Sequence, residues 1–259
     1  MRAGDILLLV PVTATVALMG LDAMTGGGVG AWLDTNLHNI AVRAGRMLSM
    51  LGMLGSVLLI IPIGAALWGR FATLPASTES GLRGAIATID AINTSIADMA
   101  RWFALALVIV TATVVIQRYV FGIASTKLQE SVIYFHALLF LLSAASTLLA
   151  DGHVRVDIIY AKLSPRAKAW TDLAGIYLAL IPMGWLILDV SGPYIAASWR
   201  ILEQSRESDG LPLIFLLKTA IPVFAAMLIL QGASMAARAA LTISGRTPPA
   251  MAQHADQEL

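Results

Sequence analysis

An uncharged run of twenty residues, Ser131 to Ala150, limits what this chain can fold into more than any other feature. Its only side chain that could be charged near neutral pH is that of His136. A helix needs about 20 consecutive apolar residues to cross the hydrocarbon core of a bilayer. The run is therefore expected to be a transmembrane helix. The polar segment DGHVRVD, Asp151 to Asp157, follows it at once.

The composition places the chain among integral membrane proteins. Hydrophobic residues make up 58% of its 259 residues and charged residues 13%, against a charged share of about 25% in soluble domains. The net charge of +1 comes without a basic run interleaved with aromatic residues, which argues against a nucleic-acid partner. There is no cysteine, so disulfides and thiolate metal sites are excluded.

Five more apolar runs predict an all-α integral membrane protein with about six transmembrane helices. The runs are Ile6–Leu21, Met47–Trp68, Trp102–Ile116, Leu173–Leu188 and Thr219–Ala237. Pro182 and Pro222 lie inside the last two, where a kink or local unwinding is expected. The first run is a retained span or a signal peptide. The single Arg2, offset by Asp5, and the lack of a clear cleavage site favour the span.

Between Pro75 and Asp98 the apolar residues recur at helical spacing. They follow steps of three and four along the chain: Leu82, Ile86, Ile89, Ile92, Ile96 and Met99. The opposite face is polar and includes Asp90 and Asn93. We expect an amphipathic helix that lies in the membrane interface. The alternative is a soluble connector helix that packs on its own protein.

The distribution of Lys and Arg predicts the orientation in the membrane. With six spans and the N-terminus inside, ten of the 17 basic residues fall on the inside and six on the outside. The positive-inside rule then places both termini and Asp151 to Asp157 in the cytoplasm. The tail after Ser244 is polar and contains Pro248 and Pro249, a composition typical of disorder.

Few ionisable groups lie within the predicted spans, and the sequence offers no catalytic, cofactor or metal site. His136 has no second histidine at matching depth with which to hold a haem. No Ser–His pair or pair of Asp residues suits an intramembrane protease. A stand-alone transporter would show paired halves or buried coupling groups, and only short Ile-Pro-x-Gly pieces hint at such a repeat. A stand-alone secondary transporter or channel and a structural or sensory membrane protein remain as alternatives.

Two polar residues of the last span invite specific expectations. Lys218 follows an apolar stretch, and acidic residues such as Glu203 precede it. It either extends to the membrane surface or pairs with a carboxylate of this chain or of a partner. Gln231, flanked by uncharged residues and next to Gly232, is expected to make a hydrogen bond between helices.

Several motifs resemble those of one known family. They are, in chain order, Gln129-Glu130 opening a span, Leu142-Ser143-Ala144-Ala145 within it, Asp151 to Asp157 after it, Gly210-Leu211-Pro212, and Leu217-Lys218-Thr219-Ala220-Ile221-Pro222. In this order they resemble the small membrane subunit, of the DctQ type, of tripartite ATP-independent periplasmic (TRAP) transporters. The resemblance covers residues 98–241, which is over half of the chain.

The resemblance implies a four-helix scaffold in a bacterial inner membrane, without enzymatic activity or a cofactor. Such a subunit holds a large elevator-type membrane subunit (M type) and helps to dock a periplasmic substrate-binding protein (P type). The transporter uses sodium to drive uptake of a solute, expected to be an organic acid. The predicted domains are a two-span N-terminal extension (1–72), an interfacial arm helix (73–97), a four-helix core (98–243) and a disordered tail (244–259). The extension is additional to the family pattern.

Seven residues are predicted to contact partner subunits or lipid headgroups: Arg101, Glu130, Asp151, His153, Arg155, Asp157 and Lys218. The alternative for Asp151 to Asp157 is that the segment only ends a helix and turns the chain at the surface. Ion pairs at a surface contribute roughly 0 to 1 kcal/mol.

Overall fold

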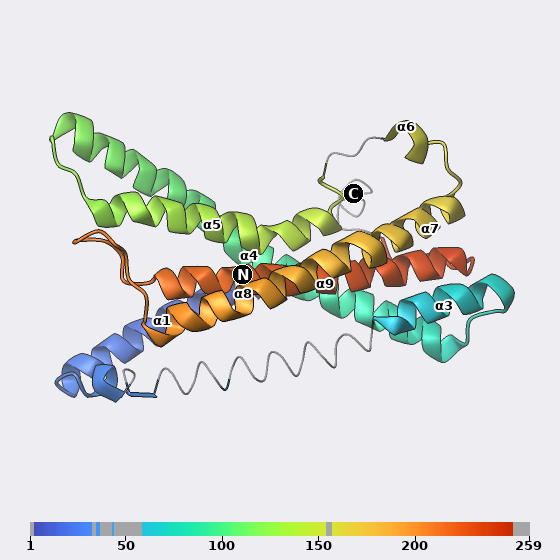
Figure 1. The fold of residues 1–259 in the computed structure, drawn as a ribbon, viewed down its shortest axis with the longest axis horizontal. Helices are drawn as coiled ribbons and strands as arrows, with labels where there is room; N and C mark the ends of the chain where they lie inside the picture. The colour runs from blue at the N-terminus through green and yellow to red at the C-terminus, as the bar shows by residue number, and fades with distance from the viewer. Residues whose placement is uncertain (1–2, 33–34, 37–42, 44–58, 154–156, 251–259) are drawn as a thin grey trace. The chain divides into compact units, whose positions relative to one another are not determined.

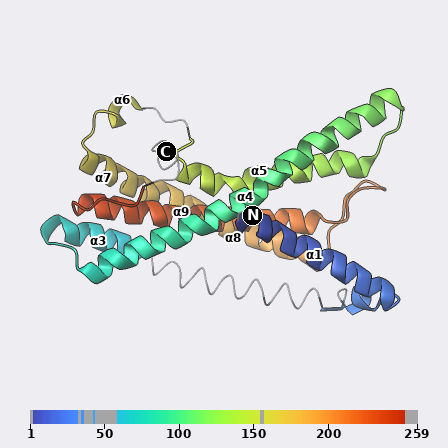
Figure 2. The same ribbon diagram turned by 180° about the vertical axis from the view of Figure 1, so that it is seen from behind.

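The structure is a computed structural model that describes the chain apart from residues 1–2, 33–34, 37–42, 44–58, 154–156 and 251–259. Within the described residues the fold is all-helical, as predicted, and holds no strand (Figures 1 and 2). The labelled elements are α1 (Ala3–Met24), α3 (Ile60–Phe71), α4 (Ala76–Val120), α5 (Thr126–Leu149), α6 (Asp157–Tyr160), α7 (Pro165–Gly175), the π-helical segment η1 (Ile176–Leu180), α8 (Ile181–Arg200) and α9 (Ile214–Ile243).

Five of the described helical stretches are long and apolar enough to cross a membrane. They are α1, α4, α5, the continuous stretch Pro165–Arg200 formed by α7, η1 and α8, and α9. The predicted span from Met47 to Trp68 falls mostly outside the described residues, and only its end is seen, in α3. The predicted disordered tail lies partly outside them as well.

Helix α4 is much longer than one crossing requires. Its 45 residues extend over about 68 Å at 1.5 Å per residue, whereas the hydrocarbon core is roughly 30 Å thick. No proline lies between Ala76 and Val120 to end it. The predicted amphipathic stretch and the predicted span from Trp102 to Ile116 are therefore parts of one uninterrupted helix.

The described chain divides into two compact units. Unit 1 comprises Met1–Gly52, Ser95–Leu142 and Ser191–Ala220, and unit 2 comprises Met53–Thr94, Ser143–Val190 and Ile221–Leu259. Helices α4, α5, α8 and α9 each have residues in both units.

Unit 2 has an apolar core built around the alanine-rich end of α9. Ala236, Ala240 and Leu241 are fully or almost fully buried there, together with Leu82 and Ile86 of α4. Small side chains allow neighbouring helices to approach closely without the large apolar residues that drive folding in water. The burial of Leu82 and Ile86 confirms the apolar face predicted for this part of α4.

Helix α5 ends in the segment whose polar residues stood out in the sequence. Asp151 adopts a left-handed conformation, with φ of 53°, directly after the helix. Its N–H donates to Leu148 O at 3.2 Å, and the N–H of Gly152 donates to Thr147 O at 2.9 Å. This pair of hydrogen bonds is the Schellman motif, in which Asp is tolerated at the left-handed position. Asp151 therefore ends α5 and turns the chain.

The irregularity expected at Pro182 is present. Proline cannot donate a backbone hydrogen bond, and its ring crowds the carbonyl four residues earlier, which belongs to Leu178. The helix accommodates this with the π-helical turn Ile176–Leu180 just before Pro182. At Pro222, by contrast, α9 continues as an α-helix.

Two glycines allow α9 to lie close to η1 and α8 in unit 2. A Cβ atom on Gly184 would lie 2.6 Å from Ile229 Cγ1, and a Cβ atom on Gly232 would lie 2.5 Å from Leu180 Cδ2. Both distances are shorter than real contacts between carbon atoms. Larger side chains at these positions would push the two helices apart.

We therefore predict that Gly232→Val lowers the free energy of unfolding by about 1 to 3 kcal/mol through overpacking. Titration of the purified chain with a denaturing detergent measures this. Gly192→Val is the matched control, because nothing lies within 4 Å of a Cβ atom there. Equal effects of the two substitutions would contradict the packing described here.

Candidate functional site

The connection between α8 and α9 is fastened to α5 by one carboxylate. Glu130 accepts hydrogen bonds from the hydroxyl of Ser205 and from the backbone N–H of Leu211, the latter at 2.6 Å. Gly210 is needed beside this contact, because a Cβ atom there would lie 2.3 Å from Ser205 Cβ. Glu130, predicted as a partner contact, thus holds a loop of its own chain.

Lys218 holds the same loop from α9. Its ammonium group donates to Glu203 Oε2 and lies 4.1 Å from the centre of the Tyr194 ring. The hydrogen bond from Lys218 holds the pKa of the Glu203 carboxyl below its usual range. The pair is thus intact above that lowered pKa and is weakened only when acid protonates Glu203. Of the alternatives for Lys218, pairing with a carboxylate within the chain is confirmed.

Arg101 connects α4 to the start of α1. Its guanidinium lies 2.9 Å from Asp5 Oδ1 and 3.3 Å from Asp98 Oδ1, and the indole N–H of Trp102 also donates to Asp5, at 3.1 Å. A Cβ atom on Gly4 would lie 2.5 Å from Asp98 Cβ. The absence of a side chain at Gly4 lets the first turn of α1 rest on α4.

The remaining predicted contact residues lie around the end of α5. Asp151 and His153 are exposed. Arg155 lies outside the described residues, and for Asp157 only its place at the start of α6 is described. No group of three or more His, Asp or Glu residues that could hold a metal ion occurs within the described part of the chain.

A polar cluster in unit 2 was not recognised as such from the sequence. Arg238 of α9 pairs with Asp90 of α4, with Arg238 Nη2 2.6 Å from Asp90 Oδ2. The hydroxyl of Ser234 donates to Asp90 at 2.7 Å, and Asn93 Nδ2 donates to Gln231 Oε1 at 2.7 Å. Asn93, Gln231 and Ser234 are completely buried. The hydrogen bond predicted for Gln231 is confirmed, and its partner is Asn93.

The polar face of the amphipathic stretch of α4 is partly covered by protein. Asn93 of this face is completely buried, whereas Ile92 of the apolar series is 44% exposed. The reason is that α9 offers polar groups to this part of α4. Gln231, Ser234 and Arg238 are spaced three and four residues apart in an otherwise apolar helix, so they share one face. That spacing was the signal from which the partners could have been sought.

These contacts have a common chemical character. Most join a carboxylate to a cation, a hydroxyl or an N–H group, and Asn93 and Gln231 join two amides. Most connect two helices or a helix to a loop. A charge in an apolar environment is costly unless it is paired and hydrogen-bonded. Such arrangements fix the positions of the elements that carry them.

Trypsin can test the role of Glu130, because Arg206 in the loop that Glu130 holds is exposed. We predict that Glu130→Ala speeds cleavage after Arg206 severalfold, since the rate follows the population of the open loop. Gln129→Ala, which changes the neighbouring residue, should leave the rate unchanged. Equal rates for the Glu130 variant and the original chain would show that the carboxylate does not hold the loop.

The Asp90–Arg238 pair is tested by a double-mutant cycle. Arg238→Met leaves Asp90 without its cation and should lower the free energy of unfolding by about 3 kcal/mol, as for other mostly buried pairs. The double variant Asp90→Leu/Arg238→Met removes both charges and should regain most of that loss. Arg200→Met at an exposed position serves as the control. If the loss of unfolding free energy in the double variant equals the sum of the losses in the two single variants, the two residues are not coupled.

Comparison with known families matches part of this chain. The model of the family "Tripartite ATP-independent periplasmic transporters, DctQ component" matches residues 107–242. Comparisons with curated proteins and with solved structures found no match. The matched residues are more than half of the 259 in the chain and include Glu130, Lys218 and Arg238. The chain therefore belongs to the DctQ component family and is a membrane component of a tripartite ATP-independent periplasmic transporter.

Proposed function

We propose that the chain is the small permease subunit that holds the large elevator-type membrane subunit in place and helps to dock the periplasmic binding protein. In this role it serves sodium-driven uptake of a solute, an organic acid, without forming the transport path itself. The proposal rests on the family and on one property of the structure. Charged groups near the membrane form ion pairs with one another within the chain.

The observation that carries the proposal is the pairing of these groups within the chain. Arg238, Lys218 and Arg101 each have a carboxylate partner within hydrogen-bonding distance. A transporter that acts alone needs polar groups free to bind and release its solute and its ion. Groups that already satisfy one another instead favour a rigid support.

Two contacts between chain segments agree with the predicted grouping of the loops on the two sides of the membrane. In unit 1, Lys127 near the start of α5 lies 2.6 Å from Asp209 of the α8–α9 loop, and both loops were assigned to the periplasmic side. In unit 2, Arg246 after α9 lies 3.2 Å from Glu79 at the start of α4, and both were assigned to the cytoplasmic side. The α8–α9 loop is then the surface available to a periplasmic binding protein.

Apolar side chains along α4 and α5 supply surface for the large subunit or for lipid. Val108 and Ile109 of α4 are 66% and 56% exposed, and Phe140 of α5 is 66% exposed. As part of the same proposal, Asp151 to Asp157 would add a polar contact on the cytoplasmic side.

Co-purification tests the proposal. We predict that the tagged chain, co-expressed with the large subunit and extracted in mild detergent, retains that subunit in a one-to-one complex. The charge-reversed variant Arg155→Glu/Asp157→Lys should retain less than about a third of it, because reversed charges meet like charges across the contact. The control is Lys127→Asp/Asp209→Lys, which exchanges the two members of an exposed pair.

The outcomes separate the two parts of the proposal. If the unaltered chain retains no large subunit, the scaffold role is wrong. If the unaltered chain and the charge-reversed variant retain equal amounts, the scaffold role stands but Arg155 and Asp157 are not part of the contact.

A further inference from the structure

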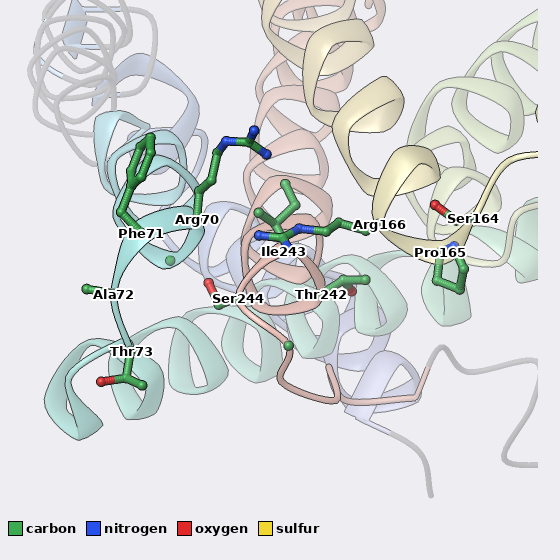
Figure 3. Close-up of a pocket in the computed structure, with 12 residues that line it drawn as sticks. Arg70, Phe71, Ala72, Thr73, Ser164, Pro165, Arg166, Thr242, Ile243 and Ser244 are labelled. Carbon is green, nitrogen blue, oxygen red and sulfur yellow. The ribbon is translucent and has the colours of Figure 1, made fainter.

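A hollow in unit 2 lies where three chain segments end or begin (Figure 3). Its volume is about 640 Å³, and it is lined by the end of α3, the start of α7 and the end of α9. This volume is within the usual range for small-molecule sites, about 300 to 1,000 Å³. None of the contacts described above lies in it.

Two arginines from different helices line the hollow. Arg70 belongs to α3 and Arg166 to α7, and both side chains extend over the end of α9 in Figure 3. No ion pair joins either of them to a carboxylate among the described residues, and none of the lining residues is acidic. Among the described residues, two guanidinium groups thus face one hollow without a carboxylate to neutralise them.

The backbone segments around the hollow approach one another closely. A Cβ atom on Gly69 would lie 1.9 Å from Ser244 Oγ, so only glycine allows α3 to approach the end of α9 here. Gly245 has φ of 75° and occupies the left-handed position that ends α9. The hydroxyl of Ser244 donates to Ala240 O at 2.7 Å, and that of Ser164 accepts from Ala167 N at 3.3 Å. The Ser244 hydroxyl is thus used within α9, whereas the Ser164 hydroxyl keeps its O–H as a donor beside the two guanidinium groups.

The end of α3 has the composition of a membrane–water boundary. Trp68 and Phe71 flank Arg70 and are 59% and 85% exposed. Aromatic and basic residues concentrate at the level of the lipid headgroups. The basic residues at this end were assigned to the cytoplasmic side, whose lipid surface is rich in anionic headgroups.

We propose that this hollow binds the phosphate of an anionic phospholipid headgroup. Arg70 and Arg166 donate hydrogen bonds to the phosphate oxygens, a contact for which the planar guanidinium is well suited. The acyl chains then lie along the exposed apolar side chains of α3, such as Leu67 and Trp68.

Native mass spectrometry of the full chain in detergent tests the site. We expect phosphatidylglycerol to bind more tightly than phosphatidylcholine. The variant Arg70→Gln/Arg166→Gln should weaken phosphatidylglycerol binding roughly 30-fold, at about fivefold for each arginine that meets an anionic lipid surface. The control Arg118→Gln/Arg200→Gln removes the same charge at two exposed positions outside the hollow and should bind phosphatidylglycerol as the original chain does.

Four results would overturn the proposal. Equal binding of the two lipids, or unchanged phosphatidylglycerol binding by the Arg70/Arg166 variant, would show that the hollow does not recognise the anionic headgroup. Displacement of the lipid by inorganic phosphate at equal concentration would assign the site to free phosphate. If the variant binds phosphatidylglycerol normally but loses the large subunit on co-purification, the arginines bind an acidic segment of that partner.

Discussion

The pairing of Asp90 with Arg238 is the interaction on which unit 2 depends most. Neither group can be left alone next to apolar helices, because an isolated charge there costs far more free energy than a packed apolar side chain contributes. Asn93 and Gln231 extend the same contact with a fully buried hydrogen bond. The first part of α4 therefore cannot leave α9 without exposing two charges and two amides to an apolar environment. This part of α4 is thereby held against α9.

The same need for buried charges and amides to be paired connects residues outside the family-matched region to residues inside it. The match covers residues 107–242, so Arg238 and Gln231 lie within it and their partners on α4 lie before it. A scaffold must present a fixed surface to a moving partner. The Asp90–Arg238 ion pair and the Asn93–Gln231 hydrogen bond join this part of α4 to the family-matched α9 and provide rigidity of the kind that the proposed role requires.

The sequence predicted the class of this fold well and its side-chain contacts only in part. Twenty uncharged residues before Asp151 are sufficient to predict a membrane helix, because hydrocarbon leaves the backbone few alternatives. Gln231 could be assigned a hydrogen bond between helices because an amide in an apolar helix needs a partner. The identity of that partner, Asn93, could not be found, because helical periodicity gives the face of one helix but not which helix lies opposite. The internal roles of Glu130 and Lys218 depend on how the α8–α9 loop folds back, which no local pattern determines.

The central claim is that this chain supports transport without performing it. The most direct test measures sodium-driven uptake in liposomes, using the solute that mass spectrometry finds bound to the partner binding protein. The account predicts uptake when the large subunit, the binding protein and this chain are present together, and none above empty liposomes with this chain and the binding protein alone. Sodium-dependent uptake without the large subunit would contradict it.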